Sequence, residues 1–408
     1  MHAGTEVAGL SSERLGYIDR FLQTQYVDTG KLKGAVVLVY RRGEVAHLGV
    51  LGAMDAERQR PMRADTLFRI YSMTKPITSL AFMMLVEQGL VALDDPVSRY
   101  IPAWKDLGVY DGGFMETFRT KPCERPMLIV DLLRHTSGLT YGFQQRSNVD
   151  AAYRQLHVGE VELYGTLDYM VEALAGLPLE FSPGTGWNYS VSTDVLGYLV
   201  GKISGQPFDQ FLRSQLFDPL EMVDTGFYAP PGEADRLAAC YTLTPQGVAL
   251  SDDPTKSRYL SAPSFVSGGG GLVSTAQDYL RFCRMVLNGG ELDRRRYVSP
   301  KTIQLMGMNH LPGGQQLSTL SRSLFSEAAY AGIGFGLGFS TTIDPAATLI
   351  PATLGDLSWG GMASTSFWID PKEDLIAILM TQLIPSSAYP IRRQLRTLVY
   401  SAFTESNV

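Results

Sequence analysis

The chain has 408 residues, of which 45% are hydrophobic and 19% are charged, and its formal net charge is -6 at pH 7. This size allows one large domain or two interlocked ones, and the negative charge argues against a protein that neutralises nucleic-acid phosphates. The first residues lack a charged segment followed by an apolar core, and the longest apolar runs are too short to span a bilayer. We therefore expect a cytoplasmic protein with no membrane and no nucleic-acid partner.

The three cysteines, Cys123, Cys240 and Cys283, are odd in number and far apart along the chain. This pattern fits neither a disulfide framework nor a Cys-x-x-Cys metal site. We expect thiols that need no function.

The first predicted elements are a helix and a hairpin. Apolar residues recur at helical spacing over residues 12–26, which predicts an amphipathic helix. The β-branched run 34–40 predicts a buried strand, and Arg42-Gly43 turns it into a second strand over residues 45–50.

The next element carries the first candidate for chemistry. Ser72 stands three residues before Lys75, at the start of an apolar pattern that predicts a helix with one buried face ending at Gly89. Residues three apart on a helix have Cβ atoms about 5–6 Å apart, so the amine could take the hydroxyl proton and activate Ser72 as a nucleophile. Backbone N–H groups at the helix start could face an oxyanion. The alternative is that Ser72 is only an N-cap, the commoner role of a serine before a helix.

From there to about residue 330 the chain predicts mainly helices and long loops. The predicted helices cover residues 127–133, 150–156, 167–177, 192–204 and 208–217, with one more capped by Ser274 or Thr275.

A loop rich in proline and glycine, residues 181–190, leads into the predicted helix 192–204 and places Tyr189 at a junction that can face a cleft. The positive charge of a nearby lysine would favour the phenolate, which could then serve as general base and later as general acid. The alternative is a tyrosine that anchors the loop through its hydroxyl.

Strand patterns return at residues 335–342, 364–369 and 374–380, and a helix over 388–403 closes the chain. Trp359-Gly360-Gly361 precedes the second of these strands, and its glycines allow close approach of another backbone or a ligand. A free strand edge there could bind substrate and offer a second N–H to an oxyanion. The alternative is a glycine turn beside a core tryptophan.

Strands at both ends of the chain with helices between them predict an α/β (α+β) fold. We expect residues 1–69 and 331–408 to form an antiparallel sheet flanked by helices. A mainly helical subdomain, residues 70–330, would be inserted into it, with the active site at the junction.

Together, three motifs resemble the serine β-lactamase and penicillin-binding-protein superfamily: Ser72-Met73-Thr74-Lys75, Tyr189-Ser190-Val191 and Trp359-Gly360-Gly361. Segments 132–139 and 271–275 are similar to the class C side of that superfamily. The resemblance spans roughly residues 10–405, and is strongest to the family VIII carboxylesterases, which share this fold but hydrolyse esters.

The resemblance implies that Ser72 is the nucleophile, Lys75 its proton acceptor, and Tyr189 the partner base that later protonates the leaving alcohol. The oxyanion hole would be the backbone N–H groups of Ser72 and Met362. The expected substrate-binding residues are Trp359, Gly360, Gly361 and Val191. The resemblance implies no cofactor and no metal, and it gives His135 and the run 268–271 structural roles only.

Two departures from the pattern bear on the substrate. Lactam-hydrolysing relatives usually carry Lys at the position of Trp359, where its charge attracts a carboxylate by about 1.5–3 kcal/mol. They usually carry Asn, which binds an acyl-amide group, at the position of Val191. Tryptophan and valine instead favour a neutral ester with a short acyl chain.

Several alternatives stay open. The same fold could serve a β-lactamase, a peptidase-like hydrolase or an acyltransferase that passes the acyl group to an alcohol. A non-catalytic penicillin-recognising domain is disfavoured because Lys75 and Tyr189 are both present. An α/β-hydrolase would need a Gly-x-Ser-x-Gly elbow, which the sequence lacks. The oligomeric state is left open.

Overall fold

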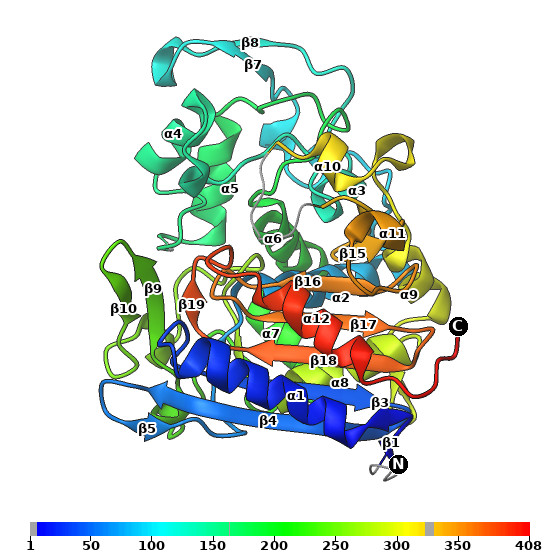
Figure 1. Ribbon diagram of the computed structural model, residues 1–408. Coiled ribbons are helices and arrows are strands. Elements are labelled where there is room, and N and C mark those ends of the chain that lie inside the picture. The colour runs from blue at the N-terminus through cyan, green and yellow to red at the C-terminus, as the bar shows by residue number, and fades with distance from the viewer. Residues whose placement is uncertain (1–5, 163, 323–329) are drawn as a thin grey trace.

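The computed structural model describes residues 6–162, 164–322 and 330–408. Its main feature is an eight-stranded sheet in which every neighbouring pair is antiparallel, in the order β14-β15-β16-β17-β18-β3-β4-β5 (Figure 1). The strands are β3 (Gly34–Arg41), β4 (Glu44–Asp55), β5 (Arg60–Pro61), β14 (Ile333–Phe335), β15 (Ser340–Thr342), β16 (Leu357–Gly360), β17 (Ser366–Asp370) and β18 (Leu375–Met380). Both ends of the chain therefore supply the sheet, which confirms the predicted fold class.

Both faces of the sheet are covered by helices. Successive side chains of a strand point to opposite faces, so Val37 and Val39 of β3 pack with α1 (Ser12–Leu22) and α12 (Ile391–Ser401). Val36 and Leu38 face the other side, in the core that includes α8 (Ala276–Leu287). Because neither face of β3 meets water, its sequence is apolar without alternation.

The predicted strand 335–342 is wrong as a single element, because the chain reverses within it. Phe335 ends β14 and Ser340 begins β15, and the two strands pair as a hairpin. The turn between them is closed by a hydrogen bond from the Gly336 N–H to the Phe339 carbonyl, 2.8 Å long. Gly338 has a φ of +95° there, and a Cβ at this position would lie 2.4 Å from Ser79. The turn thus needs glycine.

The remaining helices lie mostly where the pattern predicts them, apart from α9, α10 and α11, which the pattern does not predict. They are α3 (Ile129–Leu133), α4 (Asn148–Gln155), α5 (Leu167–Ala175), α6 (Ser192–Ser204), α7 (Phe208–Leu212), α9 (Pro300–Gly307), α10 (Leu317–Leu320) and α11 (Pro345–Thr348). Among the described residues, no helix combines the length and the hydropathy needed to cross a membrane.

Residues 70–330 also contain strands that the sequence pattern did not predict. Strands β9 (Cys240–Thr244) and β10 (Gly247–Asp252) form a hairpin, and β9 pairs in parallel with β19 (Leu383–Ile384). Helix α8 also belongs to this stretch of sequence, yet it packs against β17 and β18 of the main sheet. The division into segments 1–69 with 331–408 and 70–330 therefore stays a prediction.

Helix α2 (Thr74–Glu87) packs against α6, and its apolar residues belong to the same core as one face of the main sheet. The predicted single buried face is wrong, because every residue from Thr74 to Leu85 is buried. The helix is surrounded by other elements, so its polar residues must find partners inside the protein. Thr78, for example, donates a hydrogen bond to the Gly268 carbonyl at 2.8 Å.

Candidate active site

Ser72 lies in a 3-10 turn, Tyr71–Met73, directly before α2. The preceding strand β6 (Phe68–Arg69) pairs with β11 (Val273–Ser274), which fixes how the chain enters the turn. Tyr71 then adopts a φ of +43°, a left-handed conformation that side chains other than glycine rarely accept. The structure thus holds Ser72 at a sharp bend at the start of the helix, as predicted.

Lys75 lies one turn later, with only 2% of its surface exposed. Its Nζ donates hydrogen bonds to Ser72 Oγ at 3.2 Å and to the Gly269 carbonyl at 2.6 Å. Burial lowers the pKa of Lys75 to about 7, and the charge of Asp194 opposes that fall. A buried lysine of this kind can be neutral near pH 7, and a neutral amine can accept a proton from a serine.

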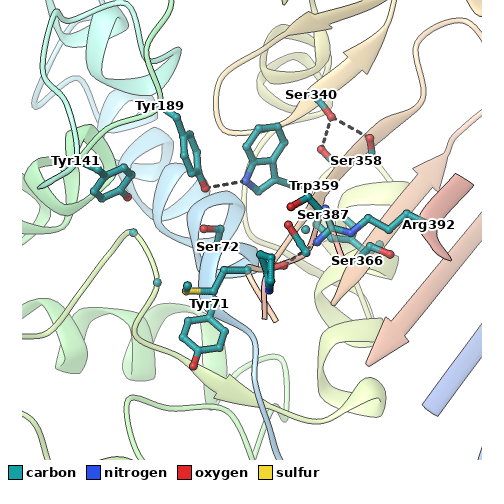
Figure 2. A pocket seen from close by; sticks show the side chains of 18 of the residues that line it. Tyr71, Ser72, Tyr141, Tyr189, Ser340, Ser358, Trp359, Ser366, Ser387 and Arg392 are labelled. Carbon is teal, nitrogen blue, oxygen red and sulfur yellow. Dashed lines mark hydrogen bonds between the residues drawn. The ribbon is translucent and has the colours of Figure 1, made fainter. Parts of the chain in front are cut away.

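Tyr189 projects from the loop before α6, and its hydroxyl hydrogen-bonds the Ser72 side chain. Figure 2 shows its ring above Ser72, with the hydroxyl end towards the serine and Trp359. Burial raises the pKa of Tyr189 above its usual value. The expectation that a lysine charge favours the phenolate is therefore wrong. Lys75 Nζ lies over the ring, 4.4 Å from its centroid. The cost of desolvating the phenolate raises the pKa of Tyr189 by more than a nearby positive charge could lower it.

Trp359 and the two glycines after it form the opposite wall of the site. Trp359 lies in β16, and its Nε1 donates a hydrogen bond to the Tyr189 hydroxyl at 3.2 Å (Figure 2). Gly361 lies against the backbone before the nucleophile, since a Cβ there would come within 2.4 Å of the Ile70 carbonyl oxygen. The glycine allows another backbone to approach, as the sequence predicts. Met362 follows and lines the same cavity as Ser72.

That cavity has a volume of about 560 Å³. Each predicted substrate-binding residue lines it: Val191, Trp359, Gly360 and Gly361. Its wall near the nucleophile is aromatic, since Tyr141 stacks on Phe143 with ring centroids 4.6 Å apart. The volume lies within the range of small-molecule sites, about 300–1,000 Å³.

One charged residue near Lys75 is not among the residues that the sequence analysis singles out. Asp194, in the first turn of α6, is fully buried among the site residues and accepts hydrogen bonds from Ser267 Oγ and from the Gly269 N–H at 2.9 Å. The Gly269 carbonyl in turn accepts from Lys75. The sequence feature that could have pointed to Asp194 is the presence of a carboxylate just after the Tyr189-Ser190-Val191 motif. The run 268–271 therefore contacts the candidate base, a role that the resemblance did not give it.

His135 lies beside Tyr189, with ring centroids 5.0 Å apart, and is buried. Burial and the charge of Lys75 lower its pKa well below the usual value. Its Nδ1 lies 3.3 Å from Ser190 Oγ. These contacts give His135 a packing role.

Comparison with known proteins identifies the family. The profile of the family described as Beta-lactamase matches residues 20–400. Esterase EstB of Burkholderia gladioli is 32% identical over 394 residues, which cover 91% of each chain. Protein Rv1367c of Mycobacterium tuberculosis is 39% identical over 361 residues, 88% of each chain. The solved structure of EstCE1, described as a hydrolase with promiscuous acyltransferase activity, superposes with a TM-score of 0.81 at 29% identity, covering 95% of this chain and 99% of its own. The chain therefore belongs to the β-lactamase family, among its esterase relatives, as the three motifs predict.

Proposed function

We propose that the protein is a serine carboxylesterase of the family VIII type that hydrolyses neutral esters with short acyl chains through an acyl-Ser72 intermediate. The observation that carries the proposal is the convergence on Ser72 Oγ of the Lys75 amine, at 3.2 Å, and the Tyr189 hydroxyl. The likeness to an esterase over nine-tenths of the chain supports the reaction class.

Lys75 is the first base in this mechanism. Its pKa of about 7 leaves a neutral fraction near neutral pH, whereas the raised pKa of Tyr189 keeps the phenol protonated. Lys75 therefore takes the Ser72 proton as Oγ attacks the ester carbonyl carbon. The carbonyl oxygen becomes an oxyanion that accepts hydrogen bonds from the N–H groups of Ser72 and Met362.

Tyr189 completes the first half of the reaction. It donates its phenolic proton to the leaving alkoxide as the C–O bond breaks, and the Lys75 ammonium returns a proton to it. Water then attacks the acyl-Ser72 carbonyl and gives its proton to the same bases. They return that proton to Ser72 Oγ as the bond between Oγ and the carbonyl carbon breaks, and the acid leaves. The Trp359 N–H, which donates to the Tyr189 oxygen, stabilises the transient phenolate.

The wall around Ser72 favours neutral groups. Trp359 occupies the place where lactam-hydrolysing relatives carry a lysine, and Val191 is buried with no side-chain hydrogen-bonding group. We expect a panel of p-nitrophenyl esters from acetyl to dodecanoyl to show highest kcat/KM for short chains. A chromogenic cephalosporin assayed beside it should turn over much more slowly.

Ser72→Ala tests the proposal directly. We expect the variant to lose ester hydrolysis to the level of a blank, because no nucleophile remains to form the acyl-enzyme. Mass spectrometry of wild type quenched during turnover should show the acyl group on the peptide that contains Ser72. Hydrolysis by the variant at the wild-type rate would refute the mechanism.

Acyl transfer to an alcohol is the second candidate. EstCE1 is described as having a promiscuous acyltransferase activity, and one curated relative at 27% identity is named Acyltransferase calJ, from Penicillium decumbens. Both reactions share the acyl-Ser72 intermediate and differ only in the acceptor. Product analysis with and without an added alcohol separates them, since a transferase forms the new ester in preference to the acid.

A further inference from the structure

We propose that Arg392 is a positioning residue of the oxyanion hole, holding the Gly361–Met362 peptide so that the Met362 N–H faces the reacting carbonyl. The proposal rests on the function proposed above and assigns a role to a residue that none of the three motifs contains.

Arg392 lies at the start of α12 and reaches across to the bend that follows β16. Its Nη2 donates one hydrogen bond to the Gly361 carbonyl at 2.6 Å and another to the Thr365 carbonyl at 2.9 Å. Figure 2 shows the side chain extending from the helix towards this bend, on the far side of Trp359 from Tyr189. One nitrogen thus ties the two ends of the bend together.

The Gly361 carbonyl and the Met362 N–H belong to one peptide unit. In a trans peptide these two groups point in opposite directions, so fixing the carbonyl towards Arg392 turns the N–H away from it. Met362 and Ser72 line the same cavity. Within the described parts of the chain, the Met362 N–H donates to no other protein group. This N–H is therefore available to donate a hydrogen bond to a bound ligand.

Other contacts fix this bend relative to the nucleophile. The Gly361 N–H donates to the Thr365 carbonyl at 2.9 Å, and Thr365 Oγ1 lies 3.5 Å from the Ile70 carbonyl. Ile70 is two residues before Ser72, so the bend and the nucleophile turn share a direct contact. Arg392 holds the bend from the side of α12, and its side chain also lines the cavity that contains Ser72.

Gly360 leaves the space that the Arg392 guanidinium occupies. A Cβ at this position would lie 2.7 Å from Arg392 Cζ and Nη2, and 2.7 Å from the Thr365 carbonyl oxygen. The first glycine of the motif therefore makes room for the guanidinium, whereas the second makes room for Ile70. This is a reason for Gly360 that is independent of the substrate.

The guanidinium also acts through its charge. A cation at the carbonyl oxygen polarises the peptide and strengthens the N–H as a donor, because hydrogen bonds in series reinforce one another. Preorganised donors of this kind act on the charge that develops in the transition state. Loss of the guanidinium should therefore reduce kcat and leave the KM for a neutral ester nearly unchanged.

The test compares Arg392→Lys, Arg392→Gln and Arg392→Ala on p-nitrophenyl acetate. We expect kcat to fall by ~10- to 100-fold for Gln and Ala, since an oxyanion donor displaced by about 1 Å costs that much, and less for Lys, which keeps the charge. Added guanidinium should restore part of the kcat of Arg392→Ala. Arg20→Gln, the same charge change at an exposed position of α1 outside the cavity, serves as the control and should keep its kcat.

Gly360→Ala gives a second test with Arg392 still present. Its Cβ would clash with the guanidinium and with the Thr365 carbonyl oxygen, so kcat should fall at least as far as in Arg392→Gln. The double variant with Arg392→Gln should lose less than the product of the two single losses, because both changes remove the contact of the guanidinium with the bend. Thermal unfolding of each variant separates loss of fold from loss of catalysis.

The outcomes separate this proposal from the one on which it rests. If the wild type hydrolyses esters and depends on Ser72, but kcat of Arg392→Gln is unchanged, the positioning role is refuted and the esterase stands. If only the KM of a carboxylate-bearing ester rises in Arg392→Gln, Arg392 binds a substrate anion and the positioning role is again refuted. Ester hydrolysis that survives Ser72→Ala would instead refute the proposed function.

Discussion

The reacting groups form two pairs, one from residues close in sequence and one from residues far apart in sequence. Ser72 and Lys75 lie on consecutive turns of one segment, and their hydrogen bond follows from a spacing of three residues. Tyr189 and Trp359 come from distant parts of the chain, a loop before α6 and strand β16, and meet through a hydrogen bond of 3.2 Å. The first pair is held by a helix and the second by tertiary packing.

Substitutions in the two pairs should therefore act in different ways. Helix α2 is buried along its length, so a substitution at Lys75 alters the chemistry of Ser72 with the backbone firmly held. Tyr189 and Trp359 are held by contacts between separate elements. A substitution at one of them should therefore also change the effect of a substitution at the other, because a hydrogen bond joins the two side chains. Four substitutions probe this contrast, and the largest effect is expected in the local pair.

Lys75→Met removes the amine from the local pair with little change of volume. We expect kcat to fall by ~10²- to 10⁴-fold, the range that a general base contributes, because Ser72 then lacks a proton acceptor. Single-turnover acylation with a p-nitrophenyl ester measures this directly. Lys202→Met, at an exposed position of α6, is the control. A variant that keeps a tenth of the wild-type acylation rate would show that Lys75 is not the base.

Tyr189→Phe breaks the distant side of the cleft and keeps the ring. Turnover should fall by ~10²- to 10³-fold with little change in KM, because only proton donation to the leaving alcohol is lost. Esters with poor leaving groups should suffer most. Tyr198→Phe, which removes the hydroxyl of a half-buried tyrosine of α6 outside the cavity, is the control and should leave turnover unchanged. Equal losses for good and poor leaving groups would contradict the acid role.

Trp359→Phe removes the indole N–H that meets the Tyr189 oxygen, and it also makes the ring that packs against Phe335 smaller. We expect about a 10-fold loss of kcat, which corresponds to one hydrogen bond to a charged group. In a Tyr189→Phe background the same change should cost almost nothing, because its partner is already gone. Steady-state kinetics of the double-mutant cycle gives the coupling. Additive losses would mean that the two side chains act independently.

Asp194→Asn should produce the smallest change, and it should appear in the pH profile. Lys75 works as a base when neutral, so log kcat/KM of the wild type should fall as the pH drops below about 7, the pKa of Lys75. The Asp194 carboxylate raises that pKa, so its removal should lower it and move this limb to lower pH. Asp209→Asn on α7 is the control. A limb that stays in place or moves to higher pH would refute the coupling.

Much of the site could be predicted because its motifs are local. The Ser72–Lys75 spacing defines their contact once a helix forms, and the apolar run 34–40 can only be a strand buried on both faces. The likeness of three motifs in one order then predicts the family, which the comparisons confirm. Motifs of this kind are short enough for the backbone alone to arrange their side chains.

Packing decided the rest. Nothing in the run 268–271 says that its Gly269 carbonyl meets Lys75, because that contact joins residues far apart in sequence. The protonation states of Lys75 and Tyr189 depend on burial by several elements at once, which outweighs nearby charges in setting their pKa values. The turn at Gly338 and the contact of Arg392 with Gly360 likewise depend on close approaches between segments that are distant in sequence. The order of residues along the chain is enough to show which functional groups are available to a substrate. The protonation states and hydrogen-bond partners of those groups follow from the packed structure, because desolvation and contact distance arise only once distant segments pack.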